Sequence, residues 1–175
     1  WDVGLGEDLE LHAVALAYAR LPELPPHAYL AVNVSAQTLL DERFTGLLTG
    51  LGDEARRIVV EVTEHAAIAD YDALAGVLQR IRVLGARLAV DDAGAGYASM
   101  QHILRLRPDI IKLDRSIVAD SDLDPARFAL IGAMASFATS LGMTVVGEGV
   151  ETSGELAALS DNQISHAQGY YLARP

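Results

Sequence analysis

Short stretches rich in β-branched and aliphatic residues alternate along this chain with longer stretches of helical period. This alternation limits the fold more than any other feature, because it is typical of βα units and of a parallel sheet. The β-rich runs cover residues 29–34, 58–62, 87–90, 110–113, 143–146 and 164–171. We therefore expect an α/β protein.

Two of the intervening helices have clear boundaries. Asp70 can cap a helix that ends before Gly85, and Asp124, followed by a proline, can cap one that ends before Gly142. These residue types are preferred at the two ends of helices. Further helices are expected over residues 9–21, 39–51 and 155–159.

Each expected strand brings a polar residue to its carboxyl end. These residues are Asn33, Glu61, Asp91 with Asp92, Lys112, Glu148 and Gln168. The loops that follow the strands build the active site of a (β/α)₈ barrel, so these side chains are candidates for the barrel mouth.

These strand-end residues recur every 27 residues on average. Eight such units would need ~216 residues. We therefore expect a TIM-like (β/α) barrel that is incomplete at the N-terminus.

Four of these residues, Glu61, Asp91, Asp92 and Glu148, are carboxylates that should converge on one mouth. Like charges in a partly dry cleft repel strongly, so such a group must bind a proton or a cation. Any one of these acids alone would more often be a helix cap or a loop residue. Together they favour a site for Mg²⁺ or Mn²⁺. Two such ions that share a carboxylate suit attack on a phosphodiester.

Lys112 is the only lysine, against twelve arginines. At a strand end beside carboxylates its ammonium could be tuned to hold or to deprotonate a water molecule. The alternative is a lysine that extends from the strand end towards solvent.

Composition restricts the function classes. The 175 residues, 51% of them hydrophobic, suit one domain over residues 1–175. The net charge of −11 argues against a nucleic-acid polymer or direct membrane contact as a partner. No apolar run approaches the roughly 18 residues that span a bilayer. The absence of cysteine excludes a thiolate metal site and is compatible with the cytoplasm, where we place the protein.

The strand-end motifs, taken in order, closely resemble the EAL domain family. They are Asn33-Val34-Ser35, Glu61-Val62-Thr63-Glu64, Asp91-Asp92-Ala93-Gly94-Ala95-Gly96-Tyr97, Lys112-Leu113-Asp114, Glu148-Gly149-Val150-Glu151 and Gln168-Gly169-Tyr170-Tyr171. The resemblance covers nearly the whole chain. It implies a cyclic-di-GMP phosphodiesterase with a TIM-like barrel, which hydrolyses cyclic di-GMP to linear pGpG with two Mg²⁺ or Mn²⁺ ions.

The resemblance also implies roles for single residues. By analogy Asn33, Glu61 and Asp91 are ligands of one metal, and Asp91, Asp92 and Glu148 surround the second. Lys112 would hold the attacking water, and Lys112 and Glu148 are the catalytic candidates. Glu64 would anchor the loop after the aspartate pair. The supporting residues are Asp114, Glu151 and Gln168.

This sequence departs from the family pattern in two ways. The Glu-Ala-Leu motif precedes its first residue, so we expect the missing strand in the rest of the protein. An incomplete barrel should be poorly stable and inactive alone. Residues 93–96 read Ala-Gly-Ala-Gly where Phe-Gly-Thr-Gly is usual. The change affects loop rigidity and loop-coupled homodimerisation. The expected partners are cyclic di-GMP and fused sensory or GGDEF-type domains.

Two other functions are compatible with the sequence. The first is a catalytically inactive cyclic-di-GMP receptor or scaffold, although a pure binder would not need the full set of acids. The second is an unrelated barrel enzyme in which Lys112 abstracts a proton beside a carboxylate-bound Mg²⁺.

Overall fold

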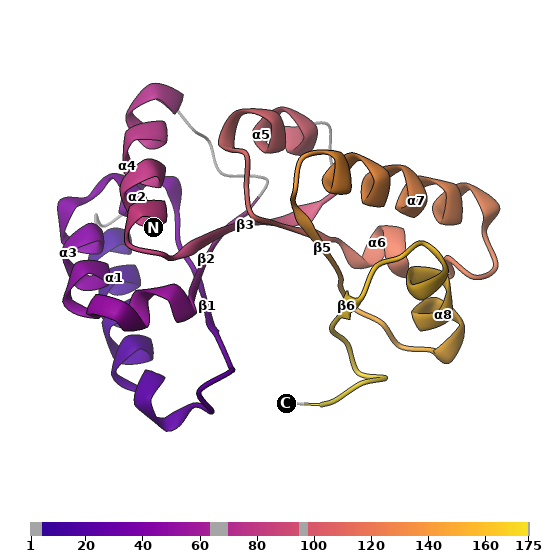
Figure 1. Cartoon of the computed structure of the whole chain (residues 1–175), viewed down its shortest axis with the longest axis horizontal. Coiled ribbons are helices and arrows are strands. Elements are labelled where there is room, and N and C mark those ends of the chain that lie inside the picture. Colours follow the sequence, from indigo (N-terminus) through magenta and orange to yellow (C-terminus); the bar gives the residue numbers. More distant parts are fainter. Residues whose placement is uncertain (1–4, 64–69, 95–97, 175) are drawn as a thin grey trace. The chain divides into compact units, whose positions relative to one another are not determined.

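The computed structural model describes residues 5–63, 70–94 and 98–174. The chain divides into two compact units, Trp1–Ala89 and Val90–Pro175 (Figure 1). The strands are β1 (Leu30–Asn33), β2 (Ile58–Thr63), β3 (Arg87–Ala93), β4 (Ile110–Leu113), β5 (Thr144–Gly147) and β6 (His166–Ala167). The α-helices are α1 (Gly6–Ala19), α2 (Ala36–Leu40), α3 (Glu42–Gly50), α4 (Tyr71–Val83), α5 (Ala98–Leu106), α6 (Arg115–Val118), α7 (Pro125–Ser140) and α8 (Ser153–Asp161). Two short 3₁₀ helices cover Leu21–Glu23 and Gly52–Arg57.

The strands follow one another in the sheet in the same order as in the sequence. β1 pairs with β2, β4 with β5, and β5 with β6, and each of these pairs is parallel. Strand β3 crosses the boundary between the units, since the first unit ends at Ala89. Parallel neighbours joined by helices confirm the predicted α/β class.

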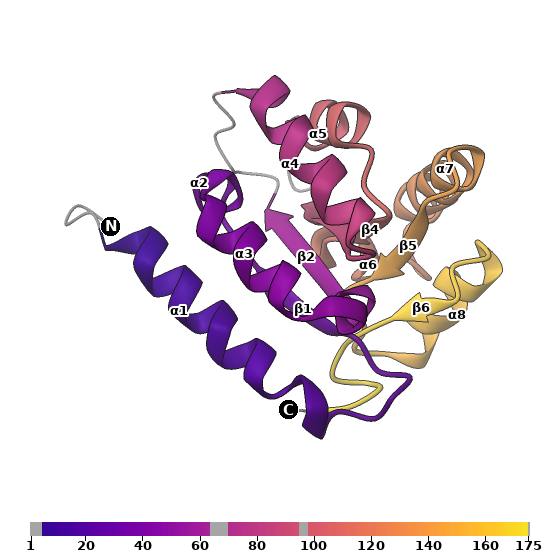
Figure 2. The same cartoon turned by 60° about the vertical axis from the view of Figure 1, so that its left-hand side comes forward.

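In the first unit, helices pack on the pair β1–β2. Helix α2 contacts α4, and α1 contacts both α3 and β1 (Figure 2). The side chains of Leu39, Phe44, Leu48 and Leu74 are fully buried between these elements. The predicted cap of α4 is confirmed, because the Asp70 side chain accepts hydrogen bonds from the second and third residues of the helix.

In the second unit, α7 contacts α6 and β5. The side chain of Asp124 accepts a hydrogen bond from Ala126 N–H at the start of α7, as predicted. Gly142 follows the helix with a φ of 72°, in the left-handed region that glycine tolerates without strain. Among the described residues, no helix is both long and apolar enough to cross a membrane.

Several predicted elements differ from the structure in extent: β3 continues to Ala93 and includes Asp91 and Asp92, and two others differ more. The helix expected over residues 39–51 is divided into α2 and α3, because Asp41 is extended and accepts a hydrogen bond from Arg43 N–H at the start of α3. The strand expected over residues 164–171 has only two residues. Beyond it the chain turns, since Leu172 N–H donates to Gly169 O at 3.0 Å.

The loop after β5 is held by one buried carboxylate, that of Glu155, which is 4% exposed. It accepts hydrogen bonds from the N–H groups of Glu151 (2.7 Å), Thr152 (3.1 Å) and Asp120 (3.2 Å). Thr152 completes a capping box at the start of α8. Burial raises the pKa of Glu155, but these N–H donors outweigh it and hold the pKa below its ordinary value of 4.5.

We expect Glu155→Ala to lower the free energy of unfolding by at least about 3 kcal/mol, because it leaves three N–H groups without their charged acceptor. Glu155→Gln should lower the free energy of unfolding by less. The pKa of Glu155 is lowered in the folded state. The wild type should therefore have a higher free energy of unfolding than Glu155→Gln above pH 4.5, and this difference should disappear as the pH falls through the folded pKa. Urea unfolding at several pH values measures this difference. Asp161→Asn, an exposed change on the same helix, is the control.

Candidate metal and phosphodiester site

The ammonium of Lys112 lies between two carboxylates of the second unit. Its Nζ is 2.9 Å from Asp91 Oδ1 and 2.8 Å from Glu148 Oε1. Lys112 is on β4, which lies between β3 and β5 in the strand order, so its side chain is next to groups from both neighbours. It is only 8% exposed. A lysine that extends towards solvent is therefore excluded.

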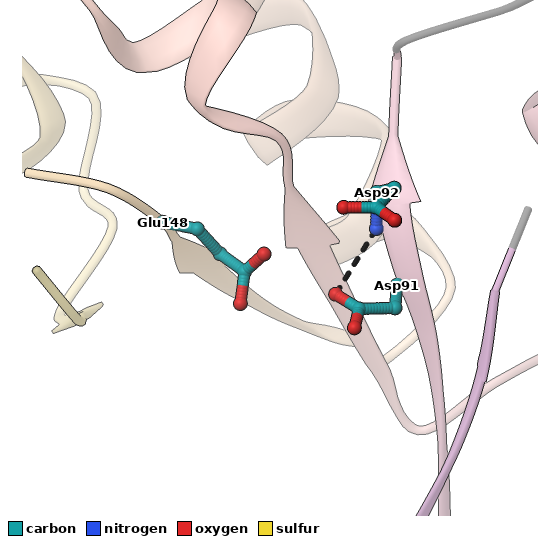
Figure 3. Close-up of side chains that lie close together, drawn as sticks. All are labelled: Asp91, Asp92 and Glu148. Atoms are coloured by element: carbon teal, nitrogen blue, oxygen red, sulfur yellow. Dashed lines mark hydrogen bonds between the residues drawn. The ribbon is translucent and has the colours of Figure 1, made fainter. Parts of the chain in front are cut away.

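Asp92 joins Asp91 and Glu148 in a group whose ligand oxygens all lie within 4.8 Å of one another. Figure 3 shows the carboxylates of Asp91 and Glu148 pointing towards each other. Asp92 N–H donates to Asp91 Oδ1 at 3.0 Å. The φ of Asp92 is 56°, a left-handed conformation that is uncommon for residues other than glycine. Such strain concentrates at functional sites, where surrounding contacts maintain it.

The group brings three carboxylates close to the ammonium of Lys112. Burial raises the pKa of Glu148 to about 7; the Lys112 ammonium opposes this rise and the negative charge of Asp91 adds to it. The donors are all oxygens, the type that hard divalent cations prefer. The group therefore fits such a cation in both charge and chemistry.

Gln168 extends the group from the loop after β6. Its Nε2 donates to Glu148 Oε1, the same oxygen that binds Lys112. Gln168 N–H also donates to Gly147 O at 2.9 Å, which fixes the glutamine beside the end of β5. The glutamine therefore orients the carboxylate of Glu148.

Asn33 and Glu61 lie side by side in the first unit. They are partners in the parallel register of β1 and β2, so their side chains leave the same face of the strand pair about 4.8 Å apart. Val34 N–H donates to Glu61 O at 3.0 Å and extends the ladder past β1. Glu61 is 7% exposed.

The other residues selected from the sequence lie elsewhere. The side chain of Asp114 caps α6 by accepting a hydrogen bond from Ser116 N–H at 2.8 Å, and Glu151 pairs with Arg115 at 2.7 Å. Among the described residues, the carboxylate group consists of Asp91, Asp92 and Glu148 and includes neither of these two. Glu64 lies outside the described residues.

Asp114 also connects α6 to the end of β3. Its N–H donates to Ala93 O at 3.3 Å. The next residue, Gly94, has a φ of 105°, and a Cβ atom there would overlap the Cδ1 atom of Ile117 in α6. Glycine is required here both for the conformation and for the close approach.

Three residues with structural roles around the site were not selected from the sequence. Arg115 packs against Gly149, directly after Glu148. Glu155 holds the loop after β5, and its capping-box spacing from Thr152 could have indicated this. Glu10 binds the segment after β1, and because 25 residues separate it from its partner, no local pattern indicated it.

A family model for the EAL domain matches residues 2–175. The chain belongs to the EAL domain family. The predicted resemblance is confirmed, and so is the TIM-like fold, because solved EAL structures match with high TM-scores. In BlrP1 of Klebsiella pneumoniae, solved as a complex with manganese and cyclic di-GMP, the match has a TM-score of 0.89 at 32% identity and covers 99% of this chain and 46% of that one.

Two relatives of this EAL chain are cyclic di-GMP phosphodiesterases by name. PdeR of Escherichia coli is 38% identical over 83% of this chain and 23% of its own length. RocR of Pseudomonas aeruginosa is 34% identical over 95% of this chain and 44% of its own length. The EAL chain thus spans less than half the length of either relative.

We expect the carboxyl group of Glu148 in this EAL chain to titrate at about pH 7 in a buffer that contains a chelator. Because the folded pKa is raised, the contribution of Glu148 to the free energy of unfolding should fall as the pH rises from 4.5 to about 7. Lys112→Met should raise this pKa further, since the ammonium lowers it. Carboxyl ¹³C NMR measures the midpoint, and Arg174→Met is the control for loss of a positive charge. A midpoint near the ordinary value would contradict the assignment.

Proposed function

We propose that the protein is a metal-dependent phosphodiesterase that hydrolyses cyclic di-GMP to linear pGpG. The observation that carries the proposal is the ammonium of Lys112 between Asp91 and Glu148, with Asp92 in the same carboxylate group. Support comes from the named activity of PdeR and RocR and from the manganese and cyclic di-GMP complex of BlrP1.

The proposed cofactor is a pair of Mg²⁺ or Mn²⁺ ions. Asp91, Asp92 and Glu148 would hold one of them, and Asn33, Glu61 and Asp91 are proposed as ligands of the other. When bound, the ions supply positive charge for the phosphate oxygens, which the carboxylates would otherwise repel. The ligand oxygens of Asp91, Asp92 and Glu148, which lie within 4.8 Å of one another, support this assignment.

Lys112 and Glu148 are the proposed catalytic residues. The Nζ of Lys112 is fixed by two carboxylates and would hold the water that attacks phosphorus. The carboxylate of Glu148, whose Oε1 is 2.8 Å from that ammonium, would accept a proton from the water. The oxygen of the water forms a bond to phosphorus, the bond from phosphorus to the ribose 3′-oxygen breaks, and that oxygen receives a proton to leave as a hydroxyl group.

The remaining residues are proposed to support this site. Gln168 would orient Glu148 through the amide hydrogen bond. Asp114 and Glu151 would support the metal and substrate shells from α6 and the loop after β5. For Glu64 the proposed role is to anchor the loop after the aspartate pair.

The cellular setting is proposed from the relatives. Because the matches cover 23% of PdeR and 44% of RocR, we propose that fused sensory or GGDEF-type domains control the activity. We also propose that the protein forms a homodimer and is located in the cytoplasm.

Lys112→Ala should lower kcat by about 10²-fold and weaken substrate binding much less, because a group that acts on the attacking water contributes mainly in the transition state. Lys112→Arg should not restore the rate, since the larger, planar guanidinium would not hold the water in the same position. Steady-state hydrolysis by the intact protein measures kcat, and equilibrium binding measures the affinity for the substrate.

Arg174→Ala, an exposed change in the same unit, controls for the loss of one positive charge. If Lys112→Arg turns over at the wild-type rate, the lysine is a counter-charge only. Tight binding of cyclic di-GMP by the wild type without hydrolysis would favour a receptor.

Removal of divalent metal should greatly weaken the binding of cyclic di-GMP, because the carboxylates then repel a ligand with two negative charges. Calorimetry of the intact protein in chelator, and again after Mg²⁺ or Mn²⁺ is restored, measures this effect. Unchanged affinity in chelator would mean that arginine side chains bind the phosphates.

A further inference from the structure

The side chain of Glu10 on α1 reaches the segment that follows β1. Its Oε2 accepts a hydrogen bond from Ser35 N–H at 2.9 Å and lies 2.8 Å from Ser35 Oγ. Both contacts are partly buried and connect residues 25 positions apart. Helix α1 contacts both β1 and α2, so these contacts lie where three elements meet (Figure 2). An ionised acceptor makes such hydrogen bonds about twice as strong as neutral ones.

The carboxylate of Glu10 also sets the direction of the Ser35 hydroxyl. A hydroxyl has one proton and two lone pairs, so a proton donated to Glu10 leaves the lone pairs for other donors. Ser35 Oγ accepts a hydrogen bond from Thr38 N–H at 3.2 Å and lies 3.1 Å from Thr38 Oγ1. Ser35 is the N-cap of α2, and Thr38 is fully buried. Glu10 thus stabilises the cap that starts α2.

Asn33 is two residues before Ser35 and belongs to the same fixed segment. On one side, Asn33 is in register with Glu61, and Val34 N–H donates to Glu61 O at 3.0 Å. On the other side, Glu10 holds the backbone and the hydroxyl of Ser35. Without Glu10 the segment would keep the strand pairing and the Ser35 cap of α2, but it would lose the hydrogen bonds that connect it to α1.

We propose that Glu10 is a positioning residue, which holds the Asn33-Val34-Ser35 segment so that the Asn33 amide oxygen is oriented to bind a divalent cation. The inference rests on the proposed role of Asn33 as a metal ligand. Groups that orient metal ligands typically change metal affinity or activity by about 10- to 100-fold when removed. Glu10 itself contacts neither metal nor substrate.

The test is a Mn²⁺ titration of the intact protein followed by electron paramagnetic resonance, which gives the dissociation constant independently of turnover. Glu10→Ala should weaken Mn²⁺ binding by about 10-fold or more, and Asn33→Ala should also weaken it. Glu10→Gln keeps one acceptor oxygen and should lose less Mn²⁺ affinity. Glu7→Ala removes an exposed carboxylate from the same helix and should leave the affinity unchanged.

Thermal unfolding of each variant separates positioning from stability. A purely structural role would lower the Tm and leave the Mn²⁺ affinity of the folded protein unchanged, which would overturn the inference. If Glu10→Ala does not fold, Glu10→Gln and Ser35→Ala replace it, and wild-type affinity in both would also overturn it. If Asn33→Ala binds Mn²⁺ normally, the proposed role of Asn33 fails and the inference fails with it. If Mn²⁺ binding is weakened in Asn33→Ala but not in the Glu10 variants, the inference about Glu10 is refuted and the proposed role of Asn33 stands.

Discussion

The ammonium of Lys112 pairs with the buried carboxylate of Glu148 and the partly buried one of Asp91, and the end of the sheet in the second unit depends on this interaction. Asp91 and Glu148 would be costly to bury as unpaired ions, because the interior solvates charge poorly. The strand order β3–β4–β5 places one cation between two anions. Burial still raises the pKa of Glu148 to about 7. The oxygens of Asp91, Asp92 and Glu148 are the donor type that divalent cations prefer.

Much of this arrangement could be predicted from the sequence, because it follows from local rules. Asp70 and Asp124 have side chains suited to capping helices, and both caps are present in the structure. The polar residues at the carboxyl ends of parallel strands meet at one edge of a sheet, which is why Asp91, Lys112 and Glu148 could be grouped in advance.

Features that depend on tertiary contacts could not be predicted. The last strand is short because Gly169 starts a turn, although the sequence around it is rich in aromatic and aliphatic residues. The left-handed backbone of Asp92 has no pattern in the sequence, since aspartate is compatible with several conformations. The contact between Glu10 and Ser35 joins a helix to a distant loop, and only the packing of α1 on β1 and α2 brings the two together.

Gly94 limits how the end of β3 can change during evolution. Any other residue at this position would strain a backbone with a φ of 105° and would force the side chain of Ile117, which is 6% exposed, to move. Because Asp114 N–H also donates a hydrogen bond to Ala93 O, the end of β3 is connected directly to the start of α6. A residue other than glycine at position 94 would therefore disturb the end of the strand that carries Asp91 and Asp92, although it touches neither carboxylate.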